Sequence, residues 1–177
     1  MIELRKLNYE DIEEEYEAIK EFPESENGFE NSYHGISREE FENEVFPLLV
    51  AHSEGKRLKE GRVPDTYFFL WDDDKIVGLF KIRHYLNEAL SRGAGHVAYG
   101  ILPKYRGKGY ATIGLQLTIE KCKEIIAEDE IYMSVRKDNV PSLKVQLKNG
   151  AYIVGETSDH YLTRIKIEKR KNSNIKK

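Results

Sequence analysis

Cysteine is almost absent from the 177-residue sequence, since Cys122 is its single thiol. A lone cysteine cannot close an internal disulfide, and it leaves no cysteine pair at zinc-binding spacing. Long apolar runs are also lacking. None approaches the ~18 residues that a membrane-spanning helix needs, and residues 1–6 contain no signal-peptide core. These absences predict a protein of the reducing cytoplasm that binds no metal and enters no membrane.

Charge of one sign is not in large excess, because 28 basic and 31 acidic residues give a net charge of −3. Residues 1–60 hold 17 of the acidic and 7 of the basic residues, so the remainder is basic. Part of that excess falls in residues 164–177, which predict a strand running into a solvated tail from about residue 168. Without a concentrated basic face that carries helical or aromatic readers, we expect no nucleic-acid partner.

The sequence does contain enough apolar material, 40% of its residues, for one hydrophobic core. A chain of this length fits a single domain over residues 1–177. Hydrophobic periodicity predicts strands over residues 2–7, 66–71, 75–83, 96–102, 131–135, 152–154 and 160–167, and helices over residues 9–22, 37–49, 109–127 and 141–148. This order predicts an α/β domain with one mixed sheet of about six to seven strands flanked by helices.

Helix-starting residues precede two of the predicted helices. Asn8 can cap the first helix, and Ser37 with Glu40 has capping-box spacing before the second, where Pro47 predicts a kink. The long third helix carries an apolar stripe made of Ala111, Leu115, Ile119, Cys122 and Ile126. Because Cys122 lies on that stripe, we predict that it packs in the core and does not act as a nucleophile.

The most informative stretch, residues 101–111, joins a predicted strand to the long helix. Pro103 ends the strand ladder, and Gly107 and Gly109 lead directly into the helix. Glycines let several backbone N–H groups point at one spot, and the first helical amides add unpaired donors. Arg106 and Lys108 add positive charge, so the stretch predicts a phosphate site. It lacks the Gly-Lys-Ser/Thr of a Walker loop and the three-glycine spacing of a dinucleotide fold.

Two motifs in this part of the chain resemble those of the GNAT superfamily of N-acetyltransferases. Residues 106–111 match the family's (Gln/Arg)-x-x-Gly-x-(Gly/Ala) motif between its fourth strand and the next helix, with Arg, Gly and Ala at the three defined positions. Residues 139–142, followed by Asn-Gly-Ala at 149–151, are similar to a second family signature. The resemblance covers about residues 66–152, and it implies a GNAT-like fold with splayed strands at the cofactor site.

The resemblance implies that acetyl-CoA is the cosubstrate and that its acetyl group passes to a primary amine. Backbone groups of Ile101 and Leu102 would contact the pantetheine arm, and one of the two amides would stabilise the reaction's oxyanion. The other implied cofactor-binding residues are Arg106, Gly107, Lys108, Gly109, Tyr110, Ala111, Asn139 and Ser142. The chain departs from the family at Gln146, where many relatives carry a tyrosine that protonates the departing thiolate. A neutral amide cannot give up a proton usefully.

A base must also take a proton from the acceptor ammonium. His96 and Tyr99 lie on the strand that enters the cofactor site, and they face opposite sides because side chains alternate along a strand. His96 has a suitable intrinsic pKa near ~6.5, whereas Tyr99 also fits core packing or a substrate wall. Arg83, His84 and Asn87 follow the predicted hairpin and are the candidate acceptor-binding residues. A solvated strand end is the alternative interpretation of these three.

Two other functions stay open at this point. Gln146 is consistent with a non-catalytic acyl-CoA-binding or regulatory module of the same fold, and the basic loop and tail are consistent with an RNA-associated protein. The acceptor amine could belong to a small molecule or a peptide. The acidic segment of residues 22–44 favours a cationic acceptor unless it is only a solvated face. No sequence feature identifies an interface, although a homodimer is compatible with the sequence.

Overall fold

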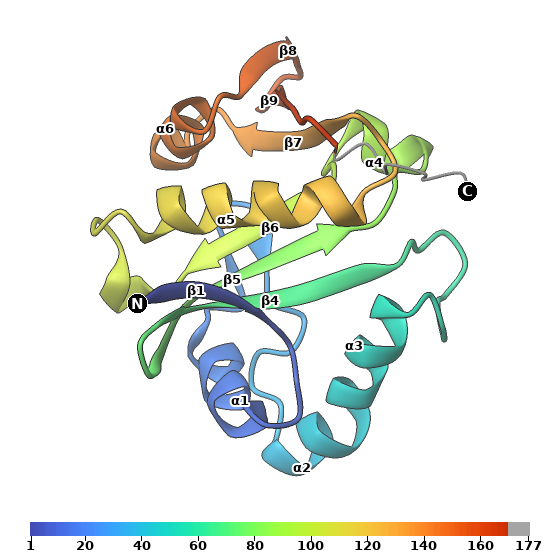
Figure 1. The fold of residues 1–177 in the computed structure, drawn as a ribbon, viewed down its shortest axis with the longest axis vertical. Coiled ribbons are helices and arrows are strands. Elements are labelled where there is room, and N and C mark those ends of the chain that lie inside the picture. Colours follow the sequence, from blue (N-terminus) through green and yellow to red (C-terminus); the bar gives the residue numbers. More distant parts are fainter. Residues whose placement is uncertain (170–177) are drawn as a thin grey trace, which may run out of the picture.

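Two antiparallel sheets organise the computed structural model, which describes residues 1–169 (Figure 1). The first sheet has the order β1 (Ile2–Lys6), β4 (Asp65–Asp72), β5 (Lys75–Arg83) and β6 (Val97–Ile101). The second has the order β7 (Glu130–Arg136), β9 (His160–Lys166) and β8 (Tyr152–Glu156). The predicted α/β class is confirmed. Most of the predicted tail, residues 170–177, lies outside the described residues.

The two sheets meet at one bridge, whereas the sequence predicted a single mixed sheet. Gly95, just before β6, pairs with Met133 of β7, and the His96 amide donates to the Tyr132 carbonyl at 2.7 Å. Gly95 has a φ of +69°, and a β-carbon there would lie 2.1 Å from the Tyr132 oxygen. Only glycine permits this approach. Beyond the bridge β6 and β7 share no ladder, as expected for splayed strands at a cofactor site.

Helices cover both faces of the first sheet (Figure 1). α1 (Ile12–Glu21) and α3 (Phe46–Ser53) pack on one face, and α5 (Tyr110–Ile125) packs on the other. α6 (Val140–Lys148) lies against α5 and β7. Shorter elements are α2 (Arg38–Glu40), the π turn η1 (Phe41–Val45), α4 (Glu88–Arg92), the 3-10 turn η2 (Pro103–Tyr105) and a hairpin of β2 (Ser25–Glu26) and β3 (Phe29–Glu30). No helix within residues 1–169 has the length and apolarity to cross a membrane.

Alternation along the strands divides the hydrophobic core into two clusters. On β5, Phe80 and Ile82 belong to the cluster under α5, whereas Leu79 belongs to the cluster under α1 and α3. Because successive side chains point to opposite faces of a sheet, Lys81 and Arg83 lie on the same face as Leu79. Two basic residues therefore reach the face that α1 and α3 cover.

Of the two predicted helix caps, Ser37 is confirmed, whereas the N-cap residue of α1 is Asp11 and not Asn8. Asn8 accepts hydrogen bonds from two amides just before α1, at 2.9 and 3.1 Å, although α1 begins three residues later than predicted. The Ser37 hydroxyl accepts from the Glu40 amide at 3.2 Å, as predicted for an N-cap. The irregularity predicted at Pro47 appears as the π turn η1 just before it, since proline has no N–H to continue the helical ladder. Cys122 is fully buried on α5, as its stripe predicted.

Candidate functional site

The opening between β6 and β7 faces backbone groups of β6 that no other described strand pairs with. The Leu102 amide donates to the Val77 carbonyl at 3.0 Å and so extends the ladder with β5. Along an antiparallel strand, residues whose backbone groups bond the neighbouring strand alternate with residues whose backbone groups point away from it. Because Leu102 bonds β5, the amides of Tyr99 and Ile101 point away from β5 and toward the opening. This corrects one predicted donor. The Leu102 amide is committed to β5, and the Tyr99 amide takes its place beside that of Ile101.

The loop between η2 and α5 presents a row of unbonded amides. Gly107 and Gly109 have φ values of +74° and +86°. A β-carbon built on either would have no atom within 4 Å, apart from those of the adjacent residues in the chain. Within residues 1–169, no acceptor bonds to the N–H groups of residues 107–111. These amides lie at the positive end of the α5 dipole. Together they form an open row of donors that fits phosphate oxygens, and phosphate binding there stays a prediction.

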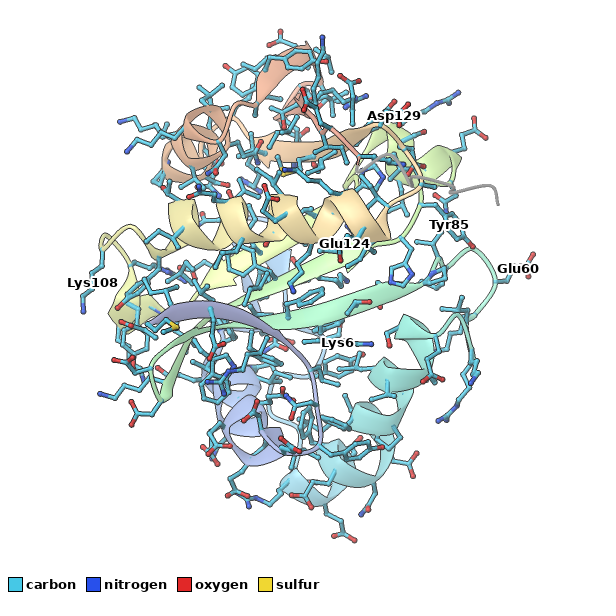
Figure 2. The ribbon with its side chains drawn as sticks, viewed as in Figure 1. Lys6, Glu60, Tyr85, Lys108, Glu124 and Asp129 are labelled. Atoms are coloured by element: carbon cyan, nitrogen blue, oxygen red, sulfur yellow. The ribbon has the colours of Figure 1, made fainter. Side chains whose placement is uncertain are left out.

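The two cationic side chains of this loop lie in different environments. The Arg106 Nε donates to the Ile101 carbonyl at 3.0 Å, and its guanidinium bonds both oxygens of Glu26 at 2.8 and 2.5 Å. Hydrogen bonding from Arg106 lowers the pKa of Glu26 below its usual range. Lys108 instead projects from the loop into solvent (Figure 2). Lys108 is thus available to a phosphate, whereas Arg106 ties the loop to the end of β6.

A connected set of polar side chains lies at the start of α6. Asn139 caps the helix by accepting from the Ser142 amide at 3.3 Å, and the Ser142 hydroxyl lies 2.8 Å from that of Tyr99. Gln146 is buried and accepts from the Thr163 hydroxyl at 2.6 Å. Burial raises the pKa of Tyr99, although hydrogen bonds with Ser142 and Gln146 oppose the rise. A protonated phenol from β6 therefore lies beside the position where the family tyrosine is missing.

His96 is fully buried, and both of its ring nitrogens are in use. Its Nδ1 accepts from the Tyr132 amide at 2.9 Å, so Nε2 carries the hydrogen and donates to the Glu128 carboxylate at 2.8 Å. Burial lowers the pKa of His96, while Glu128 opposes that shift. Neither nitrogen is available to an acceptor amine. The structure therefore gives no support to the predicted catalytic role of His96, which instead links β6 to β7.

Only one of the three predicted acceptor-binding residues lies on the face that α1 and α3 cover. Arg83 is on that face, and its Nη1 donates to the Gly95 carbonyl at 2.9 Å. His84 lies 2.8 Å from the Thr66 hydroxyl, away from Arg83. Asn87 caps α4 with its side chain. The structure therefore does not bring the three together, and His84 and Asn87 have local structural partners.

A charged cluster around Arg83 was missed by the sequence reasoning. The Lys81 ammonium lies 3.8 Å from the Asp65 carboxylate, and both side chains are largely buried. Asp65 Oδ1 is buried without a hydrogen-bond partner among the described residues, and the Tyr67 ring centroid lies 5.5 Å from the Lys81 ammonium. Burial, reinforced by Arg83, lowers the pKa of Lys81 to about 8. The available signal was the two-residue spacing of Lys81 and Arg83, because such residues share a strand face.

The β2–β3 hairpin, which lies between the first two predicted helices, connects to both sides of the opening. Its turn residues Asn27 and Gly28 both have positive φ, as a two-residue hairpin turn requires. A β-carbon on Gly100 of β6 would lie 3.4 Å from the Phe29 ring, so the two are in close contact. The Asn27 carbonyl accepts from the Asn139 amide group at 3.5 Å. With the Arg106 ion pair, these contacts join the hairpin to β6, to the loop before α5 and to the start of α6.

The site combines an open row of loop amides, two strand amides that face an opening, and a protonated phenol. Within residues 1–169, no group of three or more His, Cys, Asp or Glu side chains is placed to hold a metal ion. Backbone donors of this kind bind phosphates and stabilise an oxyanion at a reacting carbonyl. These features fit a group-transfer site that takes its group from a phosphate-bearing carrier.

Comparison with known proteins identifies the class more closely. A sequence model of the acetyltransferase (GNAT) family matches residues 9–151. The chain belongs to this family, whose members are N-acetyltransferases, and the predicted resemblance is confirmed. A search of curated protein sequences gives no match.

Solved structures of GNAT acetyltransferases share the fold. The GNAT acetyltransferase from Streptococcus pneumoniae has a TM-score of 0.62 and 17% identity, over 95% of this chain and 100% of that one. The N-acetyltransferase PseH from Campylobacter jejuni, in complex with acetyl coenzyme A, has a TM-score of 0.59 and 18% identity, over 95% and 100%. The spermidine N-acetyltransferase from Vibrio cholerae, in complex with CoA and spermine, has a TM-score of 0.60 and 18% identity, over 93% and 95%. At such identities the likeness shows the fold.

Proposed function

We propose that this chain is an acetyl-CoA-dependent N-acetyltransferase that acts on a primary amine of a small molecule or peptide. The observation that carries the proposal is the row of unbonded amides at residues 107–111, which follows the free edge of β6. The loop amides and Lys108 would hold phosphate oxygens, and the free edge of β6 offers backbone partners to an extended pantetheine arm. Two proteins of similar fold have been solved with acetyl coenzyme A or CoA.

In this reaction the neutral acceptor amine attacks the thioester carbonyl, so that a C–N bond forms, the C–S bond breaks and the sulfur leaves as a thiolate. The nitrogen passes its surplus proton to water, since neither ring nitrogen of His96 is free to take it. The amides of Tyr99 and Ile101 face the opening, where either can donate to the developing oxyanion. The Tyr99 hydroxyl, hydrogen-bonded to Ser142 and Gln146, supplies a proton to the thiolate. Holding both reactants together contributes further, since effective molarities are worth roughly 7–11 kcal/mol.

Several expectations about the whole protein stay predictions. They are the cytoplasmic location, the single domain over residues 1–177, the homodimer and the absence of a nucleic-acid partner.

Calorimetry with acetyl-CoA, combined with a free-thiol assay over a panel of primary amines, tests the proposal. We expect acetyl-CoA to bind, and thiol to be released only when an acceptor amine is present. Gly107→Ala should weaken acetyl-CoA binding at least tenfold, because the left-handed conformation strains any side-chain-bearing residue and disturbs the amide row. Gly35→Ala is the matched control, since Gly35 has the same φ of +74° and equally open surroundings.

The possible results separate the candidate functions. Binding of acetyl-CoA without thiol release over the whole panel would favour the non-catalytic acyl-CoA-binding module. Failure of every coenzyme A derivative to bind the folded protein would reject the proposal.

A further inference from the structure

The charged cluster of Asp65, Lys81 and Arg83 lies one strand away from the opening between β6 and β7. Lys81 of β5 pairs across the ladder with Ala98 of β6, which directly precedes Tyr99. Paired residues of an antiparallel ladder have Cα atoms about 5 Å apart, so the Lys81 backbone lies that close to β6. The Lys81 side chain extends on the face that α1 and α3 cover. A molecule that reaches the opening from this face therefore meets the cluster.

Positive charge exceeds negative charge in the cluster. Lys81 and Arg83 lie on one strand face, and the carboxylate that lies near Lys81 is that of Asp65. The side chains of Lys81 and Asp65 are 20% and 14% exposed, so water screens them little. Two half-buried cations that share one strand face with a single carboxylate repel each other, and an added anion would offset that repulsion.

The cluster also has hydrogen-bond donors that the protein leaves unused. A guanidinium has five N–H groups, and within residues 1–169 the only hydrogen bond of the Arg83 side chain runs from Nη1 to the Gly95 carbonyl. The Lys81 ammonium lies 3.8 Å from the nearest Asp65 oxygen, which is longer than a hydrogen bond. Unused cationic donors in a largely buried setting are what a carboxylate or phosphate oxygen requires.

We infer that the cluster recognises an anionic group on the acceptor, so that the substrate is a primary amine that also carries a carboxylate or a phosphate. The inference rests on the proposed function, because the acceptor amine must reach the opening beside Ala98 and Tyr99. An anionic group there would pair with Lys81 and Arg83 and offset their mutual repulsion. The acidic segment of residues 22–44 had suggested a cationic acceptor, but most of its acidic side chains are exposed on the outer surface.

Matched pairs of amines test the inference on the intact protein. Each pair joins an amine with an anionic group to a partner without it: 4-aminobutyrate with butylamine, 5-aminopentanoate with pentylamine, and phosphoethanolamine with ethanolamine. The first two pairs measure the effect of a carboxylate on kcat/KM, and the third measures the effect of a phosphate. We expect kcat/KM of the anionic member to exceed that of its neutral partner at least tenfold in one or more pairs. The pair with the largest ratio shows which anion the cluster takes.

Substitutions in the cluster assign the effect to its residues. Lys81→Met should lower kcat/KM about ten- to hundredfold for the anionic amine and less than threefold for the neutral one, and Lys81→Arg should restore most of the preference. Lys121→Met removes an equal charge from an exposed site on α5 and should leave the preference unchanged. The affinity of acetyl-CoA, measured by calorimetry, should be the same in all four proteins.

The outcomes separate this inference from the proposed function. A wild-type protein that acetylates neutral amines as fast as their anionic partners overturns the inference and leaves the proposed function intact. The same holds if Lys81→Met keeps the full preference. A protein that binds acetyl-CoA but acetylates no amine of either kind refutes both.

Discussion

Tyr99 brings a phenol close to Gln146, the position where many relatives carry a tyrosine and this chain does not. Its ring stacks on Phe80 with centroids 5.4 Å apart, and its hydroxyl lies 2.8 Å from that of Ser142. Because burial raises its pKa, the phenol stays protonated at neutral pH and can serve as a proton donor. Under the proposed function this hydroxyl, which comes from a strand, would take the proton-transfer role, with Gln146 of α6 beside it.

Tyr99→Phe tests this role directly, since it removes only the hydroxyl and keeps the ring stacking. We expect kcat to fall about a hundredfold, because proton transfer by a positioned group usually contributes at least that much. Acetyl-CoA affinity should change less than twofold. Tyr161→Phe, on β9, removes a hydroxyl outside the site and is the control. A Tyr99→Phe enzyme with wild-type kcat shows that the thiolate leaves without help from this group.

Glu15 is a second residue whose environment has a measurable consequence. It is fully buried on α1, its Oε1 accepts from the Asn8 amide at 3.1 Å, and its Oε2 has no partner among the described residues. Burial raises its pKa from 4.5 to about 8. The folded state therefore keeps a proton that the unfolded state releases above pH 4.5. As the pH rises from 4.5 to about 8, the free energy of unfolding should decrease by up to about 1.4 kcal/mol per pH unit.

Glu15→Gln should remove this dependence, because glutamine has a similar shape and no titratable proton. We expect the variant to be more stable than the wild type at pH 8 and to lose that advantage at pH 5. Urea unfolding at the two pH values measures the difference. Glu14→Gln, at an exposed neighbouring position, should follow the wild type at both. Equal pH dependence of Glu15→Gln and wild type would mean that Glu15 is ionised in the folded protein.

Among the elements, the β2–β3 hairpin governs how much positive charge the loop between η2 and α5 can offer to a ligand. Glu26 of the hairpin holds the Arg106 guanidinium through two hydrogen bonds and places a negative charge beside the loop. Glu26→Gln should release the guanidinium and tighten acetyl-CoA binding about two- to fivefold, the size expected for a partly exposed ion pair. Calorimetry at low salt measures the change. Glu24→Gln, an exposed position on the same segment, should have no effect, and weaker binding by Glu26→Gln would contradict the argument.

Elements that are specified by residues close together in the sequence were predictable. Elements that form only through contacts with distant parts of the chain were not. The loop and α5 follow from Pro103, two glycines and an apolar stripe that lie within one short stretch of chain. The division into two sheets depends on Gly95 meeting β7, a contact with no local signature. The β2–β3 hairpin has an Asn27-Gly28 turn, but its strands are two residues long and show no alternation. Tertiary contacts decide such elements.

The candidate site divides in the same way. The shape of the loop before α5 and its unbonded amides were predictable, because glycine conformation and helix-end amides act over a few residues. The burial of His96 was not, since it depends on Glu128 and on the backbone of β7. Lys81 was missed although its spacing from Arg83 was visible, because only the fold places Asp65 beside it.

In the whole molecule, the two sheets share few direct contacts near the opening. The Gly95–Met133 bridge and the hydrogen bonds of His96 join β6 to β7, while α5 and α6 span the sheets from one side. A ligand that binds the free edge of β6 and the start of α6 adds contacts across this junction. Binding of acetyl-CoA should therefore stabilise both sheets together.

This coupling predicts two measurable effects of saturating acetyl-CoA. At 100 times its Kd, a ligand specific for the folded state adds about 2.7 kcal/mol of stability, which for a domain of this size raises Tm by roughly 5–10 °C. Hydrogen exchange should slow at the Tyr99 and Ile101 amides, in residues 107–111 and in β7, because opening of either sheet breaks the shared contacts. At the same ligand concentration, Gly107→Ala should lose about half of the added stability or more, because a tenfold weaker Kd leaves about 1.4 kcal/mol. Protection confined to residues 107–111, with unchanged exchange in β6 and β7, would show that the cofactor binds the loop without joining the sheets.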